Sequence, residues 1–183
     1  DENLNDLEKR SLDKNFIRSR NEIVLDGYTA DRSLRIVAWG NVNALGEKQS
    51  VSEAQTIEDL KVMLKSQDGL AVTPDSLYYG SEQVLTKAGG VAKETEIVIR
   101  PKVGTVTIET RGLQEQLGRM GLRSSVDCDF YLNNTLSGFD YRGTLIGDSV
   151  YYNPEGAWNE SGVEWITPSM QTACPGQDMA VSI

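Results

Sequence analysis

Residues 92–110, AKETEIVIRPKVGTVTIET, decide the fold class. Before Pro101, Ile97 and Ile99 share one face, with Glu96, Val98 and Arg100 on the other, and after Gly104 the run 105–109 alternates polar and apolar residues. A period of two places the apolar side chains on one face of a β-strand. We therefore predict a β-hairpin at the centre of a mostly β domain, with Val106 and Ile108 buried. Pro101 cannot donate a backbone hydrogen bond to a neighbouring strand, so it indicates an edge or a bulge.

Similar short alternating runs recur along the chain between glycine, asparagine and proline turns. The predicted strands cover 22–26, 33–39, 125–132, 139–146, 150–153, 163–167 and 179–183. In the run 125–132, Val126 and Phe130 share the face that we expect to be buried. Many short strands of this kind are typical of a β-sandwich of two antiparallel sheets.

Three further segments complete the predicted architecture. Residues 41–56 are polar and are predicted to form a long surface loop. Residues 56–65 fit either a helical stripe or a strand face, and we favour a turn at Glu58 and Asp59 followed by a strand. Residues 113–120 place Leu113, Leu117 and Met120 at helical spacing, which predicts one short helical excursion.

Composition narrows the classes of function. The 183 residues carry a formal net charge of -9, which argues against a nucleic-acid partner because no basic stripe is present. The chain has no histidine, which removes the commonest general base and the commonest transition-metal ligand. We therefore expect no catalytic residue, no cofactor and no metal site, and we expect that the protein is not an enzyme.

Some residues still suggest rival functions. Asp127 and Asp129 share one strand face, as two carboxylates in a metal site or an acid–base pair do, but polar residues on an outward face need no such role. A carboxylate-based hydrolase remains a distant alternative. The second-ranked hypothesis is a glycan-binding module, in which exposed aromatic rings stack on sugars. Its candidate residues are Trp39, Trp158, Trp165, Tyr151 and Tyr152.

The cysteines allow two interpretations. Cys128 and Cys174 can form one disulfide in an oxidising compartment, or they can be two independent small apolar residues. Their spacing does not decide between these alternatives. The chain starts at Asp1 and ends in an apolar run, which we interpret as a piece of a longer gene product.

Four segments together resemble the fimbrillin-associated anchor family, the anchor and assembly subunits of type V fimbriae. The first is Ser33–Asn41, which ends in Val-Ala-Trp-Gly-Asn, and the second is Asp75–Gly80 with its Leu-Tyr-Tyr-Gly element. The third is Ile97–Ile108. The fourth is Phe139-Asp-Tyr-Arg-Gly143, followed by Val150-Tyr-Tyr-Asn-Pro154. The residues that carry the resemblance have structural rather than catalytic characteristics: Trp39, Gly40, Tyr79, Gly80, Phe139, Tyr141 and Gly143.

The resemblance implies a transthyretin-like (Greek-key) antiparallel β-sandwich in a lipoprotein at the surface of the bacterial outer membrane. It implies an amino-terminal sandwich over residues 1–177 that lacks its first strands, and a second domain or linker strand that starts at 178–183. The implied partners are other fimbrial subunits, which donate or accept a β-strand. The implied membrane attachment is a lipidated cysteine upstream of residue 1.

Overall fold

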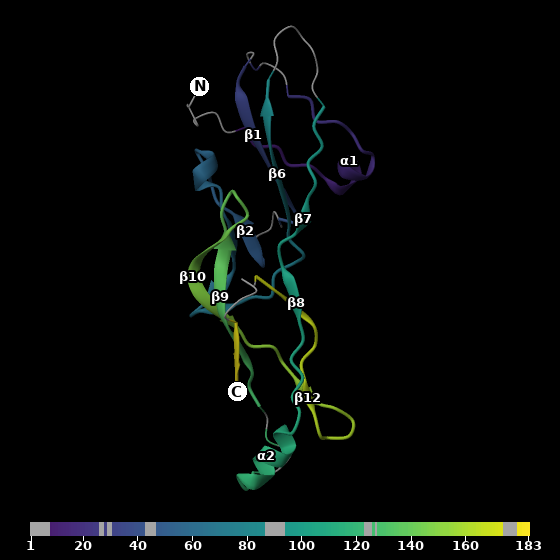
Figure 1. The fold of residues 1–183 in the computed structure, drawn as a ribbon, viewed down its shortest axis with the longest axis vertical. Coiled ribbons are helices and arrows are strands. Elements are labelled where there is room, and N and C mark those ends of the chain that lie inside the picture. The colour runs from purple at the N-terminus through teal and green to yellow at the C-terminus, as the bar shows by residue number, and fades with distance from the viewer. Residues whose placement is uncertain are drawn as a thin grey trace.

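The computed structural model describes residues 8–25, 28, 31–42, 47–86, 94–122, 126, 128–173 and 179–183. The molecule is elongated and built mainly of strands (Figure 1). The described helices are short: α1 (Lys14–Arg18), the 3-10 turn η1 (Ile57–Asp59) and α2 (Leu113–Arg119). Within the described ranges, no helix is long and apolar enough to span a membrane.

One end of the molecule holds a sheet of strand order β1–β6–β7, formed by β1 (Ser33–Gly40), β6 (Tyr78–Leu85) and β7 (Arg100–Pro101). The strands β1 and β6 pair antiparallel along their whole length, from Ser33 opposite Leu85 to Gly40 opposite Tyr78. The β7 pairing is short, and it joins Tyr79 to Arg100. The helix α1 lies at the same end, and the Asp13 carboxylate caps it by accepting a hydrogen bond from the Phe16 N–H at 2.7 Å.

The centre of the molecule is a larger sheet, here called the β9 sheet. Its strand order is β2–β3–β9–β10–β5–β4, and β14 also pairs with β9. The bounds are β2 (Gln49–Val51), β3 (Val62–Leu64), β4 (Ser66–Gln67), β5 (Leu70–Ala71), β9 (Tyr131–Phe139), β10 (Leu145–Tyr152) and β14 (Ala180–Ser182). The pairing of β10 with β5 is parallel, so the sheet is mixed rather than purely antiparallel.

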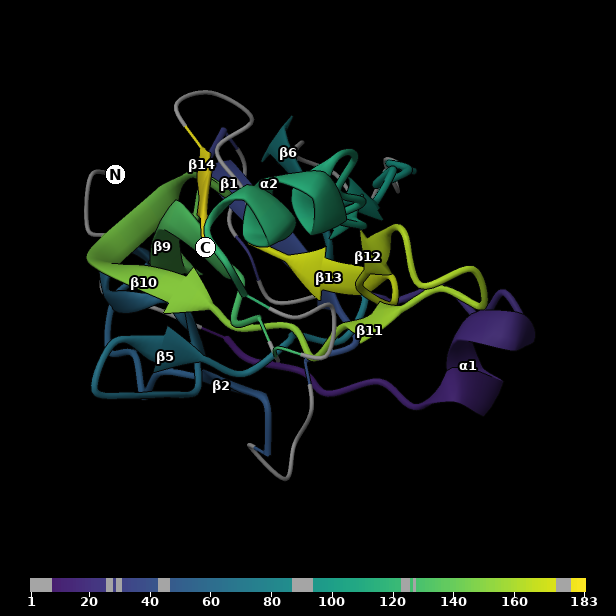
Figure 2. The same cartoon turned by 90° about the horizontal axis from the view of Figure 1, so that it is seen from below.

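Two small antiparallel pairs extend toward the far end, beside α2 (Figures 1 and 2). They join β8 (Gly104–Val106) to β13 (Met170–Thr172), and β11 (Ala157–Trp158) to β12 (Trp165–Ile166). In the view along the long axis, β10 and β5 lie on one side and β11 with β12 on the other (Figure 2). The mostly β fold class is therefore confirmed.

The core lies under the β9 sheet. Its buried members come from β3, β5, β9 and β10 of that sheet, from β13 and from the residues next to β6 and β13, and they are Val62, Leu64, Ala71, Leu77, Leu132, Phe139, Val150, Tyr152, Met170 and Ala173. A smaller cluster of Ile108, Phe130 and Trp165 forms toward the far end. Of the four side chains predicted to be buried, Ile108 and Phe130 are buried, whereas Val106 and Val126 are half-buried.

The predicted hairpin at 92–110 is wrong. Its first half runs beside β6 and enters the ladder only as β7, while its second half pairs with β13 as β8. The described residues 94–99 are in no strand, and Val98 is 58% exposed. The physical reason is that alternation identifies a face but not a partner, and Pro101 ends the first half at an edge.

The strand bounds predicted at 125–132 and 139–146 are wrong, although the face predicted to be buried is not exposed at Val126 and Phe130. The strand β9 runs from Tyr131 to Phe139, and residues 140–144 form the turn into β10 instead of continuing a strand. The Asp140 carboxylate holds this turn by accepting hydrogen bonds from the Arg142 N–H at 2.9 Å and the Thr144 N–H at 2.8 Å. An aspartate that bonds the backbone shortly after it is a turn signal that competes with strand propensity.

The remaining predictions have mixed outcomes. Residues 22–25 form no strand, and the loop predicted at 41–56 contains β2, whose Gln49 is fully buried. The turn at Glu58 and Asp59 followed by a strand is confirmed as η1 and β3, and the helical excursion is confirmed as α2. Residues 180–182 pair with β9, and the predicted domain boundary at 177 and 178 stays a prediction.

Candidate docking site

The strand β1 lies at the edge of its sheet. It pairs with β6 on one side, and its other side has no strand partner among the residues that the structure describes. It is eight residues long and carries the apolar side chains Leu34, Ile36 and Val37, all of them half-buried. A long apolar edge strand is a template for the addition of another strand.

The ladder pattern identifies which backbone groups of β1 face outward. The Thr86 N–H donates to the Arg32 carbonyl at 2.8 Å, so these two residues form a hydrogen-bonded pair. In an antiparallel ladder such pairs recur at every second residue, which directs the N–H groups of Leu34, Ile36 and Ala38 toward β6. The residues between them face outward, and they are Ser33, Arg35, Val37 and Trp39. No described residue outside this sheet bonds their N–H and C=O groups, so within the described chain these groups are open to an added strand.

Apolar side chains also remain exposed elsewhere at this end of the molecule. Leu85 at the end of β6 is 53% exposed, and Val98 and Ile99 beside β6 are exposed as well. Ile23 and Val24, in the segment before β1, are also exposed. This end of the molecule therefore buries much less of its apolar surface than the β9 sheet does.

Aromatic residues connect the two sheets. Trp39 on β1 lies opposite Tyr79 on β6, and their ring centroids are 4.9 Å apart. Trp39 also reaches Phe139, the last residue of β9, with a centroid separation of 5.7 Å. Phe139 is 1% exposed and belongs to the core. We call Trp39, Tyr79, Phe139 and Tyr141 the aromatic junction, because they join the edge sheet to the β9 sheet.

Tyr141 completes the aromatic junction from the turn between β9 and β10. The Tyr79 hydroxyl donates a hydrogen bond to the Tyr141 carbonyl at 3.0 Å. The Tyr141 side chain is buried, and its hydroxyl accepts a hydrogen bond from the Arg142 Nε at 2.8 Å. This bond with the Tyr141 hydroxyl raises the pKa of the Arg142 guanidinium above its usual value.

Glycines allow the backbone to approach the aromatic junction closely. A Cβ atom at Gly80 would lie 2.5 Å from the Val98 carbonyl oxygen. Gly143 has φ of +70°, and a Cβ atom there would lie 2.7 Å from Cδ1 of Tyr79. Gly40 is less restricted, because a Cβ atom would meet Cβ of Tyr78 at 3.3 Å. The structure thus gathers all seven motif residues of the sequence analysis into one region.

Three cations lie against the rings of the aromatic junction, and no pattern in the sequence predicts this arrangement. The Arg35 guanidinium carbon lies 5.8 Å from the centroid of the Tyr141 ring, and that of Arg142 lies 5.0 Å from the same centroid. The Lys102 Nζ lies 5.1 Å from the centroid of the Tyr79 ring. We call Arg35, Lys102 and Arg142 the cation cluster. Each comes from a different part of the sequence, so no local motif reveals the cluster.

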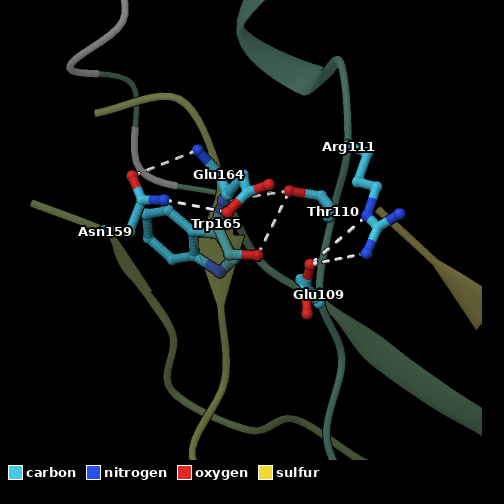
Figure 3. Close-up of polar contacts among 6 residues, drawn as sticks. All are labelled: Glu109, Thr110, Arg111, Asn159, Glu164 and Trp165. Carbon is cyan, nitrogen blue, oxygen red and sulfur yellow. Dashed lines mark hydrogen bonds and ion pairs between the residues drawn. The ribbon is translucent and has the colours of Figure 1, made fainter. Parts of the chain in front are cut away.

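The tryptophans of the glycan-binding hypothesis pack internally. The rings of Trp158 and Trp165 are nearly perpendicular, at 85°, and Trp165 is 5% exposed. The Thr110 hydroxyl holds the strand of Trp165 by accepting a hydrogen bond from the Trp165 N–H at 3.0 Å (Figure 3). Gly156 lies against the indole, because a Cβ atom there would be 2.1 Å from Nε1 of Trp165. This geometry is that of packing and offers no coplanar platform for a sugar.

The polar contacts at this end are local. The Asn159 Nδ2 donates to the Glu164 carboxylate at 3.0 Å, and Glu109 pairs with Arg111 (Figure 3). Two other candidates were the carboxylate pair of Asp127 and Asp129 and a disulfide between Cys128 and Cys174. Asp127 and Cys174 lie outside the described ranges. Asp129 is exposed and Cys128 is half-buried, and the disulfide stays a prediction. In the described part of the chain, no group of acidic or cysteine residues is suited to hold a metal ion.

Comparisons with known proteins give a consistent result. Residues 1–175 match the family described as fimbrillin-A associated anchor proteins Mfa1 and Mfa2. The major fimbrium anchoring subunit FimB of Porphyromonas gingivalis is 28% identical over 159 residues, which cover 85% of this chain and 52% of that protein. The chain therefore spans about half the length of the curated relatives that it matches.

Solved structures agree on the fold. The fimbrial anchor protein Mfa2 from Porphyromonas gingivalis superposes with a TM-score of 0.61 at 19% identity, over 84% of this chain and 56% of that one. A candidate adhesin from Bacteroides thetaiotaomicron superposes with a TM-score of 0.66 at 17% identity, over 99% of this chain and 65% of that one. At such low identity these two similarities concern the fold.

Proposed function

Because the chain belongs to the family of fimbrillin-A associated anchor proteins, we propose that it is part of a structural subunit that anchors or assembles fimbriae at the bacterial surface. The similarity to the FimB anchoring subunit supports this role. The role requires docking surfaces and no reacting group, in keeping with a chain that has no histidine. The proposal includes outer-membrane attachment through a lipidated cysteine upstream of these residues.

The observation that carries the proposal is the open edge of β1. A β-strand of another fimbrial subunit adds to β1 and bonds the outward N–H and C=O groups of Arg35, Val37 and Trp39. Backbone hydrogen bonds give affinity in this mode of recognition, and alternate side chains give specificity. The added strand also covers apolar surface that is exposed near β1, which stabilises the assembly by about 25 cal/mol for each Å² removed from water.

The test compares two substitutions at Val37, whose N–H faces outward. Val37→Pro removes this N–H, and its ring obstructs an added strand, while the ladder to β6 keeps its bonds. Val37→Thr keeps the N–H and is the matched control. In bacteria that express the full-length protein, we expect Val37→Pro to release fimbriae into the medium and Val37→Thr to retain them.

Electron microscopy of the cells and immunoblots of the medium measure this retention. Thermal unfolding of the purified chains shows whether the two variants are equally folded. Retention of fimbriae by folded Val37→Pro would contradict strand addition at β1. Retention by cells that lack the gene would contradict the anchoring role itself.

A further inference from the structure

The cation cluster gathers positive charge on one face of the β1–β6–β7 sheet, and its member Arg35 lies on the edge strand β1. Arg35 shares a face of β1 with Trp39, and Trp39 lies opposite Tyr79 on β6. Tyr79 in turn lies opposite Arg100 on β7, and Lys102 follows two residues later. The turn that carries Arg142 lies against the same face, because the Tyr79 hydroxyl bonds the Tyr141 carbonyl. Strand pairing and the hairpin turn thus bring these cations together.

Among the residues that the structure describes, the cation cluster has no ion-pair partner. None of Arg35, Lys102 and Arg142 has a described carboxylate within ion-pair distance, although other cations of the chain do. Asp140 and Glu58 raise the pKa of Arg142 from a greater distance. Aspartate and glutamate number 27 against 18 lysines and arginines, so carboxylates are abundant in this chain.

Like charges that are held close together repel one another. The contacts of these cations with tyrosine rings offset part of this repulsion. An incoming carboxylate offsets it further, because hydrogen bonds between ionised groups are roughly twice as strong as neutral ones. Arg35 and Arg142 are exposed, so a ligand can reach their side chains without a change in the fold.

We propose that the cation cluster binds an acidic side chain of the strand that adds to β1. This inference rests on the proposed function and names the chemistry of the partner. A residue directly opposite Arg35 on an added strand has its Cβ about 4.5–5.5 Å away, so an aspartate or glutamate there reaches the guanidinium. The next residues on the same face lie opposite Val37 and Trp39, so they are apolar.

An antiparallel partner strand therefore has a recognisable pattern: one acidic residue, with apolar residues two and four positions before it. A membrane lipid or a free anion would use the charge of the cation cluster but not the backbone of β1. The adjacency of Arg35 to the outward N–H of Val37 favours a peptide partner. Because the proposed partner is a peptide strand with a defined pattern, synthetic peptides can test the proposal.

The probe is a threonine-rich peptide with one glutamate and with valines two and four positions before it, which is the order that an antiparallel strand places opposite Arg35, Val37 and Trp39. Its counterpart has glutamine in place of the glutamate. With the full chain at low salt, calorimetry is expected to show about tenfold tighter binding of the glutamate peptide. This preference shrinks as salt rises to about 0.5 M, because salt screens exposed charges.

Two triple variants separate the cation cluster from net charge. Arg35→Gln, Lys102→Gln and Arg142→Gln together are expected to reduce the preference to less than about twofold. The control replaces Arg111, Arg119 and Lys65 by glutamine, which removes the same number and types of charge elsewhere and keeps the preference. Arg35→Gln alone serves as a second variant, which leaves the Arg142–Tyr141 bond in place, and it is expected to lose most of the preference.

Equal binding of the two peptides, or no binding of either, would overturn the proposal. It would also be overturned if vesicles with anionic phospholipids or inorganic phosphate bind in a cluster-dependent way while the peptides do not discriminate. None of these results bears on anchoring, because fimbrial retention tests that role separately. A failure of the peptide test with intact retention would therefore reject only the role of the cation cluster.

Discussion

The β1–β6–β7 sheet and the β9 sheet use similar alternating sequences but differ in what covers them. In the β9 sheet, β10 lies on one side of β9, and β3 and β14 share the other side, over a core that includes Leu132 and Phe139. In the β1–β6–β7 sheet, β1 is an edge, and Leu85 on β6 stays exposed. The difference indicates that the β9 sheet is a packed scaffold, while the β1–β6–β7 sheet is suited to accept a strand from a partner.

The largest expected effect is on the free energy of unfolding, when one leucine in each of the two sheets is replaced by alanine. Leu132 on β9 is 2% exposed, whereas Leu85 on β6 is 53% exposed. Leu132→Ala leaves a cavity and is expected to lower the free energy of unfolding by about 2–5 kcal/mol. Leu85→Ala is expected to change it by less than about 0.5 kcal/mol. Chemical denaturation of both variants measures the difference, and similar losses would mean that the two sheets are equally packed.

The next prediction concerns the aromatic junction that joins the two sheets. Gly143 and Gly112 both have positive φ, of +70° and +74°, but a Cβ atom would clash with Tyr79 only at Gly143. Alanine at Gly112 costs about 1 kcal/mol from backbone strain alone. At Gly143 the clash adds about 1–3 kcal/mol. Equal losses of unfolding free energy for the two alanine variants would contradict the close contact between Gly143 and Tyr79.

A smaller effect concerns the pH dependence of the β9 sheet. Burial raises the pKa of the Tyr152 hydroxyl above its usual value, although the hydrogen bond that it accepts from the Ala173 N–H lowers it slightly. The folded state then holds this proton more tightly than the unfolded state does. The contribution of Tyr152 is fully present below about pH 10, the unfolded pKa, and falls as the pH rises above that value.

The variant Tyr152→Phe isolates this effect. It is expected to lose about 1 kcal/mol at neutral pH, because the Ala173 N–H loses its acceptor. Above about pH 10 its unfolding free energy should fall less steeply than that of the natural sequence. Parallel slopes for the two chains in thermal unfolding between neutral and alkaline pH would show that Tyr152 does not contribute.

The sequence predicted where single strands and helices lie better than it predicted which strands pair with each other. Alternation located β1, and helical spacing located α2, because both patterns depend on near neighbours. The hairpin at 92–110 failed because its two halves find partners in β6 and β13, which lie far from each other in the sequence. The strand predicted at 139–146 has wrong bounds because the Asp140 carboxylate holds a turn there that the alternation does not reveal.

The candidate site shows the same limit. The residues of the aromatic junction were found through a family resemblance, whereas the cation cluster was not found. Arg35 and Lys102 are 67 positions apart in the printed numbering, and they meet through the pairing of β1 with β6 and of β6 with β7. Long-range strand pairing is what single-sequence patterns leave undetermined.

Amide hydrogen exchange along β1 tests the central claim most directly. In the chain alone, the N–H groups of Ile36 and Ala38 bond β6 and should be protected, while those of Val37 and Trp39 face outward and should exchange quickly. On addition of a purified fimbrial subunit, Val37 and Trp39 should become protected, and Ile36 should change little. Protection of both sets in the chain alone, or no gain of protection at Val37 in the complex, would contradict an open strand-accepting edge at β1.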